Sequence, residues 1–68
     1  MTQQQAAAYI FAQAMCAQAE IAGMQAVNAQ YVARGEEPPR SEAEFTAMID
    51  RYGISHNAVL RLFEEATP

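Results

Sequence analysis

Residues 2–34 read TQQQAAAYIFAQAMCAQAEIAGMQAVNAQYVAR, a stretch without proline whose only charged residues are Glu20 and Arg34. Alanine, the residue with the highest helix propensity, recurs throughout it, and glutamine, methionine and isoleucine fill most of the remaining positions. This pattern predicts one long helix over residues 3–34. At 1.5 Å per residue such a helix is a rod of about 48 Å, which is too long for the rest of the chain to cover on every side.

Local signals mark both ends of this helix. Thr2 followed by Gln5 is a weak capping box, and Gly35 is a typical residue for the C-terminal cap. Two prolines at positions 38 and 39 prevent the helix from continuing. Residues 35–40 are therefore expected to form a short connector.

The second half of the chain predicts two short helices. Ser41 with Glu44 is a stronger capping box, and it opens a helix over residues 42–52. Gly53 ends that helix, and Ser55 caps a third one over residues 55–66. We therefore expect an all-α fold: a single helical domain over residues 1–68, with one long N-terminal helix packed on two short helices.

A chain of 68 residues buries little apolar surface and needs additional stabilisation. Cys16 is the only cysteine, which excludes a disulfide within one chain, and no Cys/His cluster indicates a metal or another cofactor. Association of two copies is the remaining common solution, so we expect a homodimer through the long helix.

A helical wheel divides the long helix into two apolar sectors. In one sector the residues follow a heptad-like spacing between positions 10 and 31. The two short helices are together long enough to cover one of the two sectors. A second copy should cover the sector that remains, but the wheel does not show which sector that is. The candidate dimer contacts come from both sectors: Ile10, Phe11, Met15, Ile21, Ala22, Met24, Ala26 and Ala29.

A narrow strip of the wheel is left for solvent or for a foreign partner. Tyrosine and arginine often anchor protein interfaces, and the only acid on this strip, Glu20, could orient an arginine of the partner. Further acids follow in the connector and at the start of the second helix. The candidate partner-binding residues are Tyr9, Glu20, Tyr31, Arg34, Glu36, Glu37, Glu42 and Glu44.

Composition argues against nucleic-acid binding and against catalysis. The chain has a net charge of −4, with four arginines, no lysine and eight acidic residues, whereas phosphate binding needs clustered basic residues. His56 is the only histidine, and the sequence positions no nucleophile or carboxylate to act with it. Cys16 lacks a basic neighbour that would lower the pKa of a catalytic thiol. We expect no enzymatic activity.

Residues 45–65 offer an alternative function. Their sequence, FTAMIDRYGISHNAVLRLFEE, resembles a helix-turn-helix, in which His56, Asn57 and Arg61 would face DNA bases. Two features depart from that motif: Ile49 stands where a small residue is usual, and Glu64 and Glu65 lie on the helix that would face DNA. A DNA-binding regulator is therefore one alternative, and an anti-CRISPR-like inhibitor is another.

The opening QQQAAAYIFAQAMCAQAEIAGMQA, the connector EEPPR and the segment RYGISHNAVLRLFEE together resemble the small early proteins of Mu-like temperate bacteriophages. The resemblance extends to the quorum-sensing anti-activators of these phages. It implies a non-catalytic helical homodimer in the host cytoplasm that binds a LuxR-type transcriptional activator and blocks its DNA binding. It also implies binding to the type IV pilus assembly ATPase and exclusion of superinfecting phages. No long apolar run predicts a membrane span, and no basic leader predicts secretion.

Overall fold

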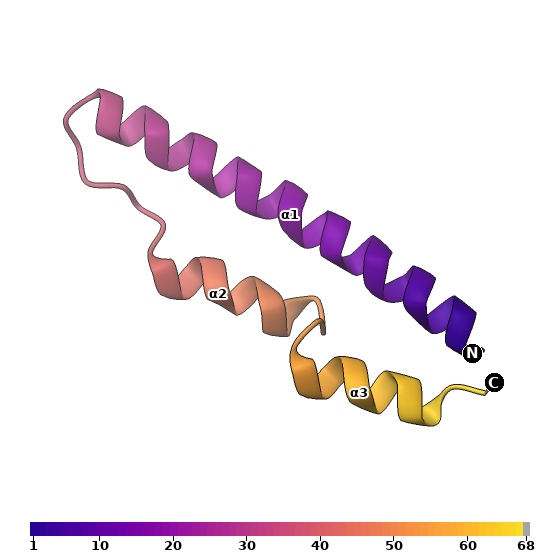
Figure 1. The fold of residues 1–68 in the computed structure, drawn as a ribbon. Coiled ribbons are helices and arrows are strands. Elements are labelled where there is room, and N and C mark those ends of the chain that lie inside the picture. The colour runs from indigo at the N-terminus through magenta and orange to yellow at the C-terminus, as the bar shows by residue number, and fades with distance from the viewer. Residues whose placement is uncertain (68) are drawn as a thin grey trace.

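The computed structural model describes residues 1–67, which form three helices: α1 (Gln3–Ala33), α2 (Glu42–Arg51) and α3 (His56–Glu65). α1 runs the length of the molecule, and α2 and α3 follow one another along its side (Figure 1). The molecule is all-helical with one long N-terminal helix, as the sequence predicts. Each helix ends within one residue of its expected limit; Pro68, the last residue of the expected domain, lies outside the described residues.

The N-terminal caps follow the sequence signals, with one difference. The Thr2 hydroxyl accepts the Gln5 amide, and the Gln5 side chain accepts the Thr2 amide, which completes the capping box. Ser41 and Ser55 each accept an amide of the first turn of α2 and α3, respectively. The capping box expected at Ser41 is only half formed, because the Glu44 carboxylate pairs with Arg40.

Both glycines that end a helix have positive φ angles, 75° for Gly35 and 66° for Gly53. After Gly35, the Glu36 amide donates to the Tyr31 carbonyl, and after Gly53 the Ile54 amide donates to the Ile49 carbonyl. These are Schellman motifs, which need a left-handed residue that glycine supplies without steric cost. The chain therefore turns sharply at both positions.

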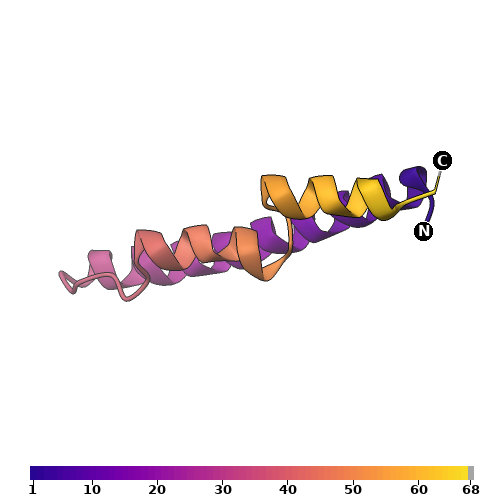
Figure 2. The same cartoon turned by 90° about the horizontal axis from the view of Figure 1, so that it is seen from below.

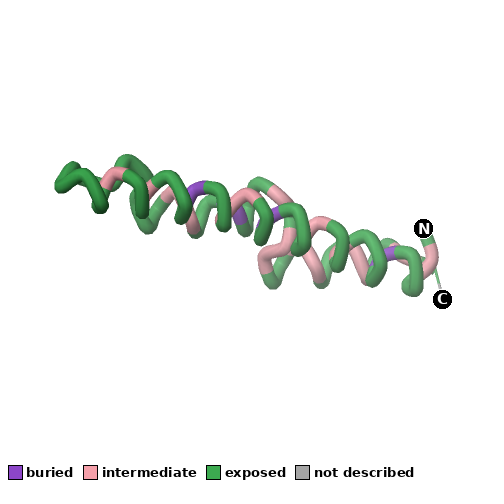
Figure 3. The backbone as a smooth tube through the Cα atoms, turned by 90° about the horizontal axis from the view of Figure 1, so that it is seen from above, coloured by how far each residue is buried: buried purple, intermediate pink, exposed green. Residues whose placement is uncertain are grey.

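One face of α1 packs against α2 and α3, and we call it the packing face. Its members, every described residue of α1 that is not exposed, recur in steps of three or four: Ala6, Ile10, Gln13, Ala17, Glu20/Ile21, Met24, Asn28 and Tyr31. The core consists of Ala6, Ala17 and Met24 from this face and Met48 from α2 (Figure 3). The heptad-like sector with isoleucine and methionine is thus the one that α2 and α3 cover.

The molecule is elongated, because α2 and α3 form a bent arm along one side of α1 (Figure 2). Its radius of gyration is 15.6 Å, whereas a compact chain of this length has about 11 Å. Two helical layers with this geometry leave most of α1 in contact with solvent.

The two ends of the described chain are joined. The Gln3 amide donates to the Thr67 carbonyl at 2.8 Å, and the Thr67 amide donates to the Met1 carbonyl at 2.9 Å. Met1 and Thr67 therefore lie side by side at the same end of the molecule (Figure 1). The C-terminal segment satisfies an amide in the first turn of α1 that has no partner within the helix.

None of the helices within residues 1–67 combines the length and the apolar character that crossing a membrane requires.

Candidate functional site

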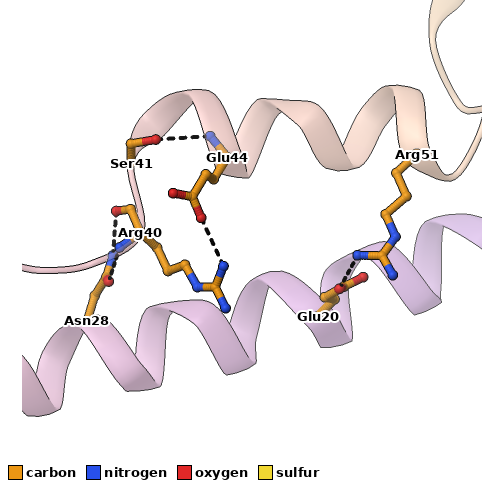
Figure 4. A network of polar contacts seen from close by, with 6 residues as sticks. All are labelled: Glu20, Asn28, Arg40, Ser41, Glu44 and Arg51. Carbon is orange, nitrogen blue, oxygen red and sulfur yellow. Dashed lines mark hydrogen bonds and ion pairs between the residues drawn. The ribbon is translucent and has the colours of Figure 1, made fainter.

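Glu20 is the centre of the polar contacts between α1 and α2. Its carboxylate accepts a hydrogen bond from the Arg51 guanidinium at 2.7 Å and one from the Tyr52 hydroxyl at 2.6 Å. The sequence pattern places Glu20 on the strip left for solvent, where it would meet an arginine of a foreign partner. In the structure it is half-buried and meets an arginine of its own chain (Figure 4). The reason is that Arg51 and Tyr52 reach over the edge of the packing face.

Tyr52 responds electrostatically to this contact. The hydrogen bond that its hydroxyl donates to Glu20 raises the pKa of Tyr52 above 10.0, and desolvation and the negative charge of Glu20 act in the same direction. A second residue of α1 contacts Tyr52: the side-chain amide of Gln13 donates a hydrogen bond of 3.2 Å to the Tyr52 carbonyl. The end of α2 is therefore fixed to α1 by polar groups.

A second polar contact fixes the start of α2. The Asn28 side chain forms two hydrogen bonds of 3.0 Å with the backbone of Arg40, one to its amide and one to its carbonyl. The Arg40 guanidinium pairs with Glu44 at 3.0 Å, one helical turn further along (Figure 4). Asn28 thus positions the backbone of Arg40, while Glu44 alone holds its side chain.

Between these two polar contacts lies a hollow with a volume of about 230 Å³. Met24 and Met48, from facing helices, supply its apolar surface, and an ion pair lies on either side. The complete lining is Glu20, Met24, Arg40, Glu44, Ala47, Met48 and Arg51. The hollow combines thioether groups with two carboxylates and two guanidinium groups, so it suits an elongated group that has an apolar part and a charged end.

The remaining candidates on the expected partner strip are not brought into one site. Tyr31 lies half-buried on the packing face, and the Arg34 guanidinium stacks 4.7 Å from the centroid of its ring. Arg34 also forms an ion pair of 3.8 Å with Glu36. Tyr9 is exposed near the other end of α1, about 37 Å from Arg34 by helical rise. The strip is therefore not a continuous binding surface.

The acidic candidates gather at one end of the molecule. Glu36 and Glu37 lie in the connector, and Glu42 and Glu44 lie in the first turn of α2. Arg34 and Arg40 pair with Glu36 and Glu44, whereas Glu37 and Glu42 form no ion pair among residues 1–67. This end of the molecule has a surplus of negative charge.

The face of α1 opposite the packing face, which we call the free face, is apolar and exposed. Phe11 and Met15 are 69% and 53% exposed, and alanines continue the face to the end of the helix. It consists of Ala8, Phe11, Ala12, Met15, Ala19, Ala22, Ala26, Ala29 and Ala33. Of the candidate dimer contacts, Ile10, Ile21 and Met24 lie instead on the packing face, where the arm packs, and the other five are on the free face.

The segment that resembles a helix-turn-helix has a different geometry. In that motif the two helices cross and pack on each other, whereas α2 and α3 each pack on α1 and lie in succession along it. His56, Asn57 and Arg61 are exposed on α3, as are Glu64 and Glu65. The segment is a bent arm, and two acids share the exposed surface of its second helix.

Comparisons with models of protein families, with curated proteins and with solved structures found no match to this chain. The hollow and the polar contacts beside it contain residues that the sequence pattern does not indicate as a site: Arg40, Ala47 and Arg51 line the hollow, and Asn28 and Tyr52 belong to the polar contacts. Only the spacing of Arg40 and Glu44, four residues apart across the start of a helix, signals one of these contacts. The others join residues far apart in the sequence.

Proposed function

We propose that this chain is a non-catalytic inhibitor of phage origin that works as a homodimer and binds host proteins. Its principal target is the DNA-binding surface of a LuxR-type quorum-sensing activator, and a second target is the type IV pilus assembly ATPase. Binding to the activator blocks DNA binding, and binding to the ATPase excludes superinfecting phages. The inhibitor acts in the host cytoplasm.

The free face of α1 is the observation that supports the homodimer in this proposal. The chain exposes 5066 Å² of surface, whereas a compact monomer of 7.5 kDa exposes about 4,250 Å². The excess of about 800 Å² equals the area that one partner buries in an interface of standard size. An excess of this size leaves enough surface for one interface of standard size with another protein.

The chemistry of the free face favours a second copy as its occupant. It contains no charged residue over its whole length, so two copies meet there without electrostatic repulsion. Its alanines let two helix backbones approach closely, and Phe11 and Met15 supply the larger apolar groups that such an interface buries. A symmetric dimer uses the same face twice and leaves the arm of each copy exposed.

The acidic end of the molecule favours a basic target. DNA-reading surfaces carry arginine and lysine, and an inhibitor with an overall charge of −4 is attracted to them. The connector presents Glu36 and Glu37 beside the acids of α2. Charge complementarity of this kind determines the encounter rate and the orientation of the complex more than its final affinity.

An electrophoretic mobility shift assay with a purified LuxR-type activator and its operator DNA tests the proposal. Excess inhibitor should abolish the shifted band, and undiminished DNA binding in its presence would overturn the proposed function. A binding assay with the purified pilus ATPase tests the second target separately.

Matched charge variants test which acidic surface of the inhibitor binds the activator. Glu36→Gln with Glu37→Gln removes two charges from the connector, and Glu64→Gln with Glu65→Gln removes two charges from the exposed side of α3. The first pair should slow the association of the inhibitor with the activator by about tenfold at low salt, and the second pair by much less. Equal effects of the two pairs would mean that net charge alone, and no defined acidic surface, causes inhibition.

A further inference from the structure

The hollow between α1 and α2 has the size of a binding site for a single side chain. Small-molecule sites usually occupy about 300–1,000 Å³, whereas this hollow has about 230 Å³. In protein complexes, single long side chains from one partner commonly fill such depressions in the other. Its occupant is therefore best sought among the side chains of a partner protein.

The walls of the hollow match an amphipathic cationic side chain. Met24 and Met48 provide a thioether surface that adapts to an aliphatic stem, and both residues belong to the core. Glu20 and Glu44 place a carboxylate on either side of this surface. Arginine fits these groups better than lysine, since its guanidinium is planar, weakly hydrated and able to bind a carboxylate with two hydrogen bonds.

The two carboxylates differ in how firmly they are held. Glu20 accepts hydrogen bonds from both Arg51 and Tyr52, so its position is fixed from two directions. Among residues 1–67, the Glu44 carboxylate pairs only with the exposed side chain of Arg40, and exposed ion pairs of this kind contribute little to stability. Because Asn28 holds the backbone of Arg40, the guanidinium can leave Glu44 without disturbing α2.

We propose that the hollow receives an arginine side chain of a basic partner protein. The aliphatic stem of this arginine lies on Met24 and Met48, and its guanidinium replaces that of Arg40 at Glu44. The charges within the hollow cancel, because two acids and two arginines line it. The net charge of −4 of the whole chain therefore favours a cationic occupant. The inference rests on the proposed function only in its choice of a basic partner.

Methyl NMR with isotope-labelled methionines tests this inference directly. The probe is N-acetylarginine amide, and the two comparison probes are the neutral N-acetylcitrulline amide and the anionic N-acetylglutamate amide. The arginine probe should shift the methyl signals of Met24 and Met48 in a saturable manner, and the comparison probes should not. Met15, on the free face of α1, is an internal control and should not respond. Stronger shifts with the glutamate probe, or equal shifts at Met15, would overturn the inference.

Two alanine substitutions on α2 provide matched variants. Ala47→Leu fills the hollow without changing a charge, and Ala43→Leu makes the same change at an exposed position that does not line it. Ala47→Leu should raise the half-saturating concentration of the arginine probe by at least about tenfold, and Ala43→Leu should leave it unchanged. Unchanged affinity in Ala47→Leu, with helix content retained by circular dichroism, would contradict the inference.

These outcomes are independent of the mobility shift assay. The arginine probe could fail to bind Ala47→Leu while the unmodified chain leaves DNA binding by the activator undiminished. This pair of results would support the hollow as an arginine site and would reject the proposed activator as the partner that fills it. Inhibition of DNA binding by an Ala47→Leu variant as strong as that by the unmodified chain would show that the hollow takes no part in binding the activator.

Discussion

The Tyr52 hydroxyl donates a hydrogen bond of 2.6 Å to the Glu20 carboxylate and so joins the end of α2 to the middle of α1, 32 positions earlier in the sequence. Arg51 binds the second oxygen of the same carboxylate. Within residues 1–67 only Ala6, Ala17, Met24 and Met48 are buried, so the apolar core between the arm and α1 is small. The polar group around Glu20 is therefore central to the position of the arm.

Replacing Glu20 by glutamine should destabilise the fold. The variant loses a charged acceptor for both Arg51 and Tyr52, and the free energy of unfolding should fall by about 1 kcal/mol. Urea denaturation followed by circular dichroism measures the change. Glu64→Gln removes the same charge from an exposed position of α3 and should change the stability by less than about 0.5 kcal/mol. In the Glu20→Gln background, Tyr52→Phe should cause little further loss of stability, because both substitutions act on the same hydrogen bond.

Stability should decrease at alkaline pH through Tyr52. Its pKa in the folded chain is raised above the ordinary value of 10.0, so folding favours the protonated phenol. The resulting stabilisation is fully present below pH 10 and disappears as the pH rises through the folded pKa. Urea midpoints between pH 9 and pH 12 should therefore fall more steeply for the unmodified chain than for Tyr52→Phe. Parallel curves for the two proteins would contradict the assignment.

Replacing the three glycines one at a time by alanine should change the stability of the fold in different directions. Gly35→Ala and Gly53→Ala force an alanine into a left-handed conformation, at a cost of about 1 kcal/mol each. Gly23 lies within α1, and an added methyl group would meet no atom within 4 Å. Gly23→Ala should therefore stabilise the helix by up to about 1 kcal/mol. Thermal denaturation of the three variants measures these opposite signs, and a destabilised Gly23→Ala would indicate that a partner backbone approaches α1 at that position.

Removal of the last two residues should loosen the first turn of α1. The truncation deletes the hydrogen bond from the Gln3 amide to the Thr67 carbonyl and the one from the Thr67 amide to Met1. Hydrogen exchange at Gln3 should become at least about fivefold faster, since one backbone hydrogen bond contributes about 1 kcal/mol. Exchange in the middle of α2 should change little. A uniform acceleration throughout the chain would instead indicate global destabilisation.

The helices and their ends could be predicted from the sequence because their signals are local. The capping signals act over three or four residues, as at Thr2 with Gln5 and at Ser41 and Ser55 with the turns that follow them. The two glycine caps are local in the same sense. These positions were identifiable without knowledge of the tertiary structure.

The sites could not be predicted as well, because they depend on contacts between distant residues. A wheel drawn for α1 alone places Glu20 on the strip left for solvent, and only the approach of Arg51 shows that it belongs to the packing face. Tyr31, which the wheel places on the same strip, lies half-buried on the packing face. Two apolar sectors of similar width also left open which one the arm would cover, and the fold resolves this in favour of the sector with Ile10, Ile21 and Met24.

Sedimentation equilibrium at tens of micromolar protein tests most directly whether a second copy covers the free face of α1, as we propose. The unmodified chain should show twice the chain mass of 7.5 kDa. Ala22→Glu, which places a charge in the middle of the free face, should show the mass of one chain with its helix content retained. Ala14→Glu, at an exposed position outside that face, should remain a dimer. A mass of 7.5 kDa for the unmodified chain would contradict the account.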